Sequence, residues 1–314
     1  MVERVLLAAP RGFCAGVERA VETVERALVR YGAPVYVRKQ IVHNSHVVRE
    51  LTARGAIFVE HEHDVPEGAT LVFSAHGVSP DVRARADARS LRTIDATCPL
   101  VTKVHAEARR FAAAGCTVVL VGHDGHEEVE GTMGEAPSAV VLVQSVADAE
   151  DLEVTDPARI AYVTQTTLSI EETAEIVAVL RRRFPALRGP AKEDICYATT
   201  NRQLAVRDLL PDIQLLLVVG SPNSSNSQRL VELARAAGVR AHLIEDASRL
   251  DDGWLEGVDS VGVTSGASAP EVLVEAVCEW FRRRGVREIR EHGDAEEDVV
   301  FRLPVELREA VAAA

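Results

Sequence analysis

The chain has five cysteines, and three of them stand where a thiol could do chemistry. Cys14, Cys98 and Cys196 follow short apolar runs and have glycine, proline or polar neighbours, so we expect them at strand ends, facing a cleft. Cys116 and Cys278 lie in an apolar strand pattern and on the apolar face of a helix pattern, as buried cysteines do. Successive loop cysteines are about one small domain apart. This spacing suggests one cysteine per domain around a common centre, although three unrelated buried thiols could show it too.

Three loop cysteines could form a metal site or a redox pair, or supply a nucleophile. Zinc sites usually take ligands in close pairs such as C-x-x-C, and the sequence has no such pair. A nucleophile would need only one cysteine. Three separated thiolates suit an iron–sulfur cluster better, because its ligands need not be adjacent in sequence. On a 4Fe-4S cluster they would leave one iron without a protein ligand, open to substrate.

The segment "GHDGHEEVEG" contains a candidate proton donor. Glu128 follows His126 by two residues, so both side chains could face one cavity from one loop. A carboxylic acid whose pKa is raised by burial can deliver a proton. Glu127 and Glu130 are better explained as acids at a helix N-terminus, where the helix dipole favours negative charge.

The segment "VVGSPNSSNSQRL" places hydroxyl and amide side chains between a strand pattern and a helix pattern. Ser224, Ser225 and Asn226, together with backbone N–H groups at a helix N-terminus, could hold a phosphate. Thr166 and Ser268 occupy equivalent positions in "VTQTTLS" and "VTSGASAP". Serine and asparagine are also ordinary caps, but several at strand ends suggest a phosphorylated ligand. The sequence has neither G-x-G-x-x-G nor G-x-x-x-x-G-K-[ST], so nucleotide folds of those two kinds have no support.

The histidines fall into three groups. His43, His76 and His126 lie just past strand patterns, where each could bind a ligand or cap local structure. The H-x-H spacing at 61–63 suggests a metal site, but the acidic, proline- and glycine-containing surroundings favour a solvated loop. His105 lies in a helix pattern, and we expect it on the surface.

Short apolar runs alternate with amphipathic helix patterns along the chain, which predicts an α/β fold with mainly parallel sheets. The expected helices stop at Gly238 and Gly285. We predict three small α/β domains, which are residues 1–97 with 286–314 packing back on them, 98–192 and 193–285. Within the last stretch, "VVFRLP" has a strand pattern.

The composition restricts the class of protein. With 314 residues and 47% hydrophobic residues, the chain can build more than one core. A net charge of −13 disfavours nonspecific binding to nucleic acid or anionic lipid, but it does not exclude a locally positive pocket for a small anion. No apolar segment is long enough to span a bilayer, and no secretory signal is evident. The sequence therefore predicts a cytoplasmic protein with neither nucleic-acid nor membrane partners.

Nine motifs in order resemble the 4-hydroxy-3-methylbut-2-enyl diphosphate reductase family, which catalyses the last step of the non-mevalonate isoprenoid pathway. They run from Cys14 to Pro270 and are "RGFCAGVERAV", "IVHNSHVV", "FSAHGVS", "DATCPLVTKVH", "GHDGHEEVEGTMGE", "TQTTLS", "DICYATTNRQ", "GSPNSSNSQRL" and "SGASAP". The resemblance implies three α/β domains in a pseudo-threefold arrangement around a central iron–sulfur cluster. It also implies reductive dehydroxylation of the allylic diphosphate to isopentenyl and dimethylallyl diphosphate, with electrons from a ferredoxin- or flavodoxin-type donor.

The resemblance assigns roles to the residues already singled out. It implies that the substrate hydroxyl binds the open iron of a 4Fe-4S cluster and that Glu128 is the proton donor. The implied cluster ligands are Cys14, Cys98 and Cys196. The implied substrate-binding residues, most of them on the diphosphate, are His43, His76, His126, Thr166, Ser224, Ser225, Asn226 and Ser268.

Two other classes of function are consistent with part of the sequence. An iron–sulfur sensor or carrier would use the three cysteines but would have no need of Glu128 or the Ser/Asn segment. A zinc-dependent phosphoester hydrolase could use "GHDGHEE" but would leave the cysteines without a role. Only the reductase uses all of these features.

Overall fold

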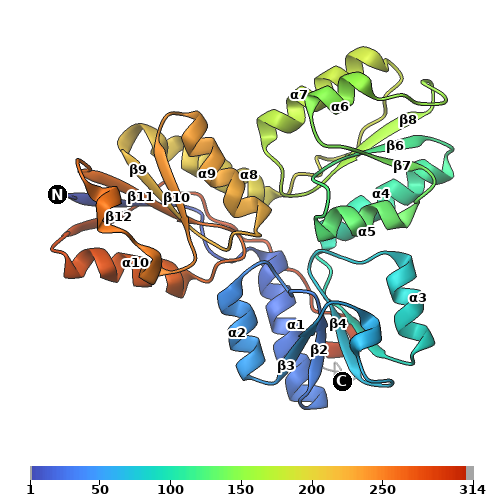
Figure 1. Cartoon of the computed structure of the whole chain (residues 1–314), viewed down its shortest axis with the longest axis horizontal. Helices are drawn as coiled ribbons and strands as arrows, with labels where there is room; N and C mark the ends of the chain where they lie inside the picture. Colours follow the sequence, from blue (N-terminus) through green and yellow to red (C-terminus); the bar gives the residue numbers. More distant parts are fainter. Residues whose placement is uncertain (1, 309–314) are drawn as a thin grey trace, which may run out of the picture. The chain divides into compact units, whose positions relative to one another are not determined.

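The computed structural model describes residues 2–308, which divide into two compact units. The first unit consists of the described residues of 1–17, 43–47 and 197–300, and the second consists of those of 18–42, 48–196 and 301–314. Each unit is an α/β structure in which helices flank parallel strands (Figure 1). The α/β class with mainly parallel sheets is thereby confirmed.

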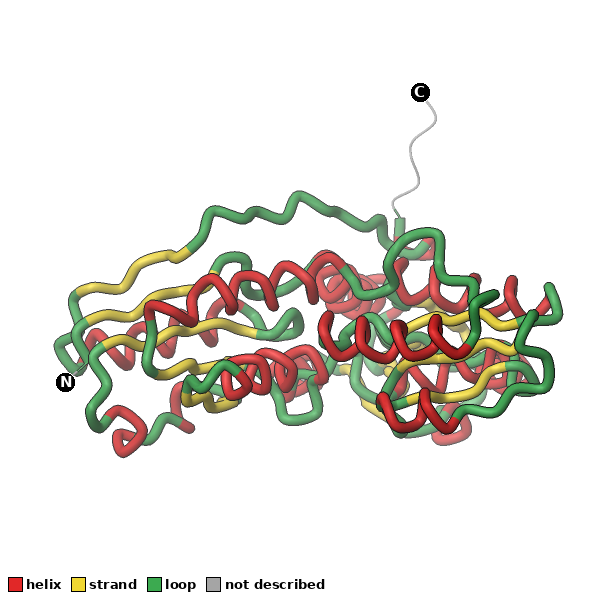
Figure 2. The backbone as a smooth tube through the Cα atoms, turned by 90° about the horizontal axis from the view of Figure 1, so that it is seen from above, coloured by secondary structure: helices red, strands yellow, loops and turns green. Residues whose placement is uncertain are grey.

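The first unit is built on one five-stranded sheet with the strand order β10-β9-β11-β1-β12. All of its pairings are parallel. The strands are β1 (Arg4–Ala8), β9 (Leu215–Val219), β10 (Arg240–Ile244), β11 (Ser260–Ser265) and β12 (Glu288–His292). The helices of this unit are α8 (Tyr197–Leu209), α9 (Ser225–Ala236) and α10 (Glu271–Arg283). Figure 2 shows the loop that continues from β12 without a further strand.

Both faces of this sheet are covered, and its inner strand β9 is apolar at every position. Leu215 and Leu217 of β9 point to one face and pack in a core with Phe281 of α10. Leu216 points to the opposite face and packs with Val206 of α8. Continuous apolar strands of this kind are typical of parallel sheets that helices cover on both sides.

The second unit contains two smaller sheets, and all of their pairings are also parallel. The four-stranded sheet has the order β3-β2-β4-β5, and the three-stranded sheet has the order β7-β6-β8. The first contains β2 (Val35–Arg38), β3 (Ala56–Val59), β4 (Thr70–Phe73) and β5 (Arg92–Asp95). The second contains β6 (Thr117–Val121), β7 (Val140–Val143) and β8 (Ile160–Thr164).

Seven helices accompany these two sheets along the described chain. They are α1 (Ala15–Tyr31), α2 (Ser45–Ala53), α3 (Pro80–Ala88), α4 (Pro99–Ala113), α5 (Glu127–Glu135), α6 (Val146–Asp151) and α7 (Ile170–Arg183). Helix α3 packs on the four-stranded sheet, where Val82 joins Leu71 and Phe73 in one core. On the three-stranded sheet, Leu120 packs with Phe111 of α4 on one face, and neighbouring strand positions pack with α7 on the other.

Two sequence-based expectations, one about the ends of two helices and one about a strand near residue 300, can be compared directly with the structure. Helices α9 and α10 end just before Gly238 and Gly285, and both glycines have positive φ, as glycine at this helix-terminal position usually does. The prediction of a strand at "VVFRLP" was wrong, because residues 299–304 form no strand. Instead the last strand of the described residues is β12, which pairs with β1. The three domain boundaries stay a prediction.

Candidate active site

Most of the predicted substrate-binding residues follow two neighbouring strands at the switch point of a sheet. At this point the connections of the two strands run to opposite sides of the sheet. In the four-stranded sheet this point lies between β2 and β4, in the three-stranded sheet between β6 and β8, and in the five-stranded sheet between β9 and β11. Ligands of open α/β sheets bind beyond the carboxyl ends of strands at such switch points. Of the predicted residues, His43 follows β2, His76 follows β4, His126 follows β6, Thr166 follows β8, Ser224 follows β9 and Ser268 follows β11.

The three loop cysteines share one structural position. Cys14, Cys98 and Cys196 immediately precede the first residues of α1, α4 and α8. All three are partly exposed, whereas Cys116 and Cys278 are buried, as predicted. A helix N-terminus favours a thiolate over a thiol because its dipole and free N–H groups stabilise negative charge. One expectation needs correction, because Cys196 follows a stretch of turns and bends and not a strand.

Each of these cysteines is also tied by its backbone to a loop that follows a switch-point strand. The N–H of Cys14 donates to Ala267 O (3.1 Å), that of Cys98 to Ala75 O (2.9 Å) and that of Cys196 to Thr166 O (3.0 Å). Ala267 and Ala75 directly precede the predicted substrate residues Ser268 and His76. Thr166 is itself a predicted substrate residue. Within each unit, a predicted cluster ligand is therefore connected directly to a predicted substrate loop.

The surroundings of Cys14 suit a metal-bound thiolate. Burial raises the pKa of the Cys14 thiol, whereas the Arg202 guanidinium and the backbone N–H groups of Val17 and Gly16 lower it. Such N–H groups and a nearby cation are the partners that a cluster-ligating sulfur needs. The donor set of the chain, three partly exposed thiols that form no disulfide, therefore fits an iron–sulfur cluster.

Glu128 is a buried carboxyl group with two hydrogen-bond partners on one residue. Only 2% of Glu128 is exposed. The Thr166 backbone N–H donates to Oε1 (2.7 Å) and the Thr166 hydroxyl donates to Oε2 (2.9 Å). Burial raises the pKa of Glu128 to about 7, against the lowering effect of the Thr166 hydrogen bonds. A carboxyl group with this pKa is partly protonated at neutral pH and can act as an acid.

The prediction that Glu127 serves only the helix dipole was incomplete. Its Oε2 lies 3.1 Å from His76 Nδ1, so Glu127 orients a predicted substrate-binding histidine. Burial lowers the pKa of His76 to about 4, with a further lowering effect of the Lys39 charge, and the imidazole is neutral at physiological pH. His126 caps α5, because its Nδ1 accepts the Glu128 N–H (3.2 Å).

The Ser/Asn segment combines caps with an unpartnered buried donor. Ser224 caps α9 by accepting the Ser227 N–H, the ordinary role that serine has at this position. Asn226 Oδ1 accepts the Ala267 N–H, whereas its Nδ2 is buried without a hydrogen-bond partner among the described residues. A buried donor in this condition costs free energy unless a ligand or water fills the gap. In the same unit, Ser268 Oγ donates to His43 O (2.9 Å).

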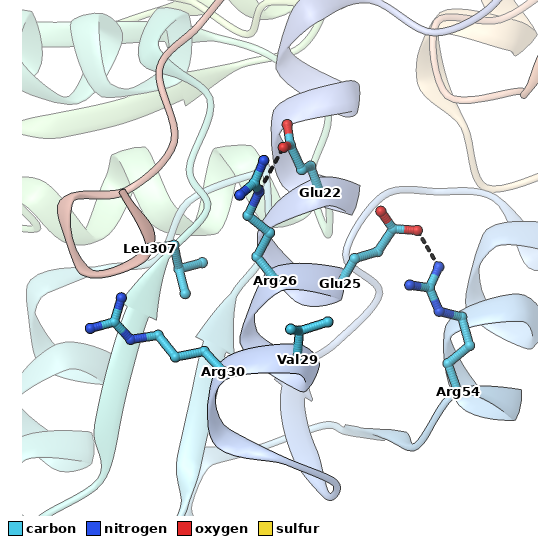
Figure 3. Close-up of a pocket in the computed structure, with 7 residues that line it drawn as sticks. All are labelled: Glu22, Glu25, Arg26, Val29, Arg30, Arg54 and Leu307. Carbon is cyan, nitrogen blue, oxygen red and sulfur yellow. Dashed lines mark hydrogen bonds and ion pairs between the residues drawn. The ribbon is translucent and has the colours of Figure 1, made fainter. Parts of the chain in front are cut away.

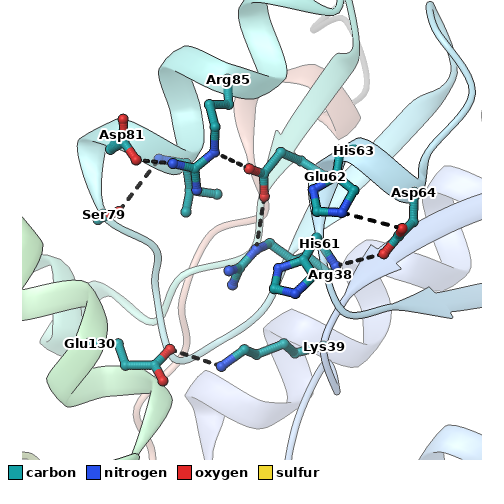
Figure 4. Close-up of polar contacts among 11 residues, drawn as sticks. Arg38, Lys39, His61, Glu62, His63, Asp64, Ser79, Asp81, Arg85 and Glu130 are labelled. Carbon is teal, nitrogen blue, oxygen red and sulfur yellow. Dashed lines mark hydrogen bonds and ion pairs between the residues drawn. The ribbon is translucent and has the colours of Figure 1, made fainter.

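Figure 4 shows the H-x-H segment. His61 and His63 stack with ring centroids 4.9 Å apart and both side chains are exposed, as expected for a solvated loop. Glu62 between them differs from that expectation, because it is buried and paired with Arg38 and Arg85. Its carboxylate thus connects the end of β2 with α3 and has a structural role.

The expectation that His105 lies on the surface was wrong. Its side chain is 4% exposed, and Nδ1 lies 2.8 Å from Glu135 Oε1. A Cβ added to Gly77 would lie 2.9 Å from His105 Cε1, so the ring packs against the backbone of the loop that contains His76. The helix pattern around His105 did not predict this burial, because Glu135 and the loop that contains Gly77 are distant from His105 in the sequence.

Comparison with known proteins identifies the family of the chain. The model of the LytB protein family matches residues 5–282, which is most of the chain.

The chain belongs to the LytB protein family.

Curated relatives in this family are similar over nearly the whole chain. A protein of Acidothermus cellulolyticus is 59% identical over 99% of this chain and 92% of its own, and one of Leifsonia xyli subsp. xyli is 58% identical with the same coverage. Both are named 4-hydroxy-3-methylbut-2-enyl diphosphate reductase. A solved structure of the E-1-hydroxy-2-methyl-but-2-enyl-4-diphosphate reductase from Plasmodium falciparum is 39% identical, has a TM-score of 0.94 and matches 98% of this chain and 97% of that chain. The resemblance drawn from the nine motifs is thus confirmed.

The structure adds two charged residues that the sequence did not single out. Lys103 Nζ donates to the carbonyls of Lys192 (2.5 Å) and Glu193 (3.0 Å) and to Asp194 Oδ1 (2.9 Å). Asp194 Oδ2 in turn accepts the Thr164 N–H at the end of β8 (3.0 Å). Lys103 follows Cys98 by about one helical turn and Asp194 precedes Cys196 by two residues. The pair therefore joins the two cysteine-bearing segments of the second unit.

We expect Lys103→Met to loosen the 192–194 segment. The substitution leaves the Asp194 carboxylate buried without a counter-charge, and loss of one partner of a buried pair costs about 3 kcal/mol. Urea unfolding should show this loss, and hydrogen exchange at the Thr164 amide should accelerate. Lys192→Met is the matched control, because the Lys192 side chain is exposed and only its carbonyl contacts Lys103. Equal stability of the two variants would contradict this role.

A pocket of about 490 Å³ in the second unit contains none of the predicted site residues (Figure 3). It lies along α1 and is lined largely by charged side chains, of which Glu22 pairs with Arg26 and Glu25 pairs with Arg54. Among the described residues, no helix is both long enough and apolar enough to cross a bilayer.

Proposed function

We propose that this chain is an oxidoreductase that removes the hydroxyl group of 4-hydroxy-3-methylbut-2-enyl diphosphate and forms isopentenyl diphosphate and dimethylallyl diphosphate. The observation that carries the proposal is the position of Thr166. Its N–H and hydroxyl bind the Glu128 carboxyl group, and its carbonyl accepts the N–H of Cys196. One residue thus connects the proposed proton donor with a proposed cluster ligand, and this link supports delivery of protons and electrons to the same substrate. The names of the curated relatives support the same reaction.

The reaction consumes two electrons and two protons, and the hydroxyl group leaves as water. None of the side chains near Glu128 supplies electrons, so a redox group is required. Cys14, Cys98 and Cys196 would hold a 4Fe-4S cluster, and their helix N-terminal positions and partial exposure fit this role. When bound, the cluster supplies electrons one at a time and an iron without a protein ligand for the hydroxyl oxygen.

Glu128 is the proton donor in this proposal. In its protonated form it gives a proton to the departing hydroxyl oxygen, so that water and not hydroxide leaves. The Thr166 N–H then stabilises the resulting carboxylate through Oε1. After it is reprotonated, the same group can deliver the second proton to the allyl carbon. Burial keeps bulk water from competing for these protons.

The diphosphate is bound by groups that donate hydrogen bonds. The hydroxyl and amide side chains at the N-terminus of α9 add to the free N–H groups there, which is a favourable site for phosphate. The neutral His76 can gain a proton when the anion binds, so it supplies positive charge only with substrate present. The proposed substrate-binding set is His43, His76, His126, Thr166, Ser224, Ser225, Asn226 and Ser268.

Three further parts of the proposal follow from the same chemistry. A ferredoxin- or flavodoxin-type protein supplies the electrons, because such carriers deliver them singly. The protein acts in the cytoplasm, where reduced thiols persist. Its three proposed α/β domains correspond to the three sheets, and the domain of residues 193–285 also takes in β1 and β12, because both strands pair within the five-stranded sheet.

Anaerobic reconstitution tests the proposal. The purified protein should show the visible and EPR spectra of an iron–sulfur cluster, and with dithionite and a viologen it should convert the hydroxylated diphosphate to both products. An iron-free protein with full activity would exclude the cluster. An intact cluster without product formation would indicate a sensor or carrier.

A further inference from the structure

Arg202 in the first unit is fully buried, although arginine is among the residues least often found there. It lies on α8, and its guanidinium contacts the loop that precedes α1. Nη2 donates to Gly12 O (2.7 Å), two residues before Cys14. Nη1 donates to Ala198 O (3.0 Å) on its own helix.

One carboxylate is ion-paired with this buried cation. Glu297 lies in the loop after β12, and both of its carboxylate oxygens accept from Arg202 Nη1 (3.0 and 3.2 Å). Asn201 Nδ2 also donates to Glu297 Oε1 (3.0 Å). Only 12% of the Glu297 side chain is exposed. The segment after β12 thus places the Glu297 carboxylate in the interior of the first unit.

The loop before Cys14 is also held by Arg11, whose guanidinium pairs with Glu271 (2.7 Å) and Glu291. Nearer the cysteine, two backbone N–H groups make the further contacts. The Gly12 N–H donates to Ser265 Oγ (2.8 Å), and the Cys14 N–H donates to Ala267 O (3.1 Å). Arg202 is the fully buried cation among these contacts, and its guanidinium binds the carbonyl two residues before Cys14. A buried ion pair adds little to stability compared with apolar side chains of similar volume. The pair therefore calls for a role other than packing.

We propose that Arg202 is a positioning residue that fixes the Cys14 loop and provides a permanent positive charge beside this ligand, and that Glu297 moderates that charge. The inference rests on the proposed function in one respect, the presence of a cluster on Cys14. A cation near a cluster stabilises its reduced, more negative form, and a carboxylate destabilises it. Arg202 and Glu297 therefore act on the cluster in opposite directions.

The test measures the reduction potential of the cluster by EPR-monitored titration of the reconstituted protein. Arg202→Met should lower the potential, because a positive charge is lost. Glu297→Gln keeps the length of the side chain but removes its charge, and it should raise the potential. Arg202→Lys keeps the charge and should stay close to the wild type. A merely structural role predicts shifts of the same sign, or no shift, in the first two variants, and either result would overturn the proposal.

Hydrogen exchange tests the positioning role without reference to the cluster. In cluster-free protein, Arg202→Lys should accelerate exchange of the peptide 11–16 by about tenfold, because a single ammonium group cannot reach both Gly12 O and Glu297. The peptide around Cys98 should exchange as in the wild type. Arg235→Met is the matched control, because Arg235 also binds a carbonyl of the first unit, that of Ala241. Unchanged exchange at 11–16 would overturn the positioning role even if no cluster formed in any variant. If Arg202→Met fails to fold, Glu297→Gln still tests the effect of charge on the reduction potential, and Arg202→Lys still tests the positioning of the Cys14 loop.

Discussion

Glu128→Gln should lose most of its turnover and retain its cluster and its affinity for substrate. Glutamine has nearly the same shape and can still accept the Thr166 N–H, but it has no acidic proton to give. Loss of a general acid lowers rates by about 10² to 10⁴. Turnover with dithionite and a viologen measures the effect, and substrate binding by the oxidised protein measures the affinity.

The same group gives turnover a defined pH dependence. The pKa of Glu128 is raised to about 7, so the proton-donating form disappears as the pH rises through that value. The rate of the wild type should fall about tenfold per pH unit above it. The small residual rate of Glu128→Gln should not show this fall.

Glu128→Gln should also stabilise the fold at alkaline pH. The native state holds a proton on Glu128 between pH 4.5 and about 7, whereas the unfolded chain has already lost it. Stability therefore decreases as the pH rises through this window, and the penalty above it is about 3 kcal/mol. Urea unfolding should show the variant more stable than the wild type at pH 8 and nearly equal to it at pH 4.5.

Glu130→Gln is the control for these measurements. Glu130 lies on the same helix, but it is exposed and pairs with Lys39 (2.9 Å). Its loss should change neither the rate nor its pH dependence. A rate near that of the wild type in Glu128→Gln would show that the proton comes from another group.

Replacing Cys14, Cys98 or Cys196 individually by alanine should abolish the cluster. With two protein ligands left, we expect loss of the iron and a drop in turnover beyond the roughly 100-fold that outer-shell partners of metal sites produce. Iron content, visible absorbance and EPR of anaerobically reconstituted protein measure the result. Far-UV circular dichroism should stay close to the wild type, because none of the three side chains is part of a buried core.

Cys116→Ala and Cys278→Ala are the matched controls. Both cysteines pack in apolar cores of the α/β units, so the substitutions should cost stability of about 1 kcal/mol and leave the cluster intact. A variant of a loop cysteine with full iron content would remove that residue from the ligand set. Loss of the cluster in a control would show that the choice of three from five cysteines is wrong.

The sequence by itself determined the α/β class and separated the three partly exposed loop cysteines from the two buried ones. Short continuous apolar runs that alternate with amphipathic helix patterns, such as the run in β9, indicate strands covered by helices on both sides. The neighbours of Cys14, Cys98 and Cys196 distinguish them from Cys116 and Cys278, because local residues decide whether a thiol lies in a loop or in a core. Long motifs in a fixed order were sufficient to indicate the family.

Contacts between residues distant in sequence were decided only by the tertiary structure. His105 was expected on the surface but is buried against Gly77 and Glu135. Glu127 orients His76, and Thr166 joins Glu128 to Cys196. The strand order that places the predicted substrate loops at switch points likewise cannot be read from one sequence. The local sequence pattern indicates whether a side chain prefers water or a core. The hydrogen-bond partner of that side chain is fixed only when strands from separate parts of the chain pair. The tertiary structure therefore decides which groups lie close enough to exchange a proton.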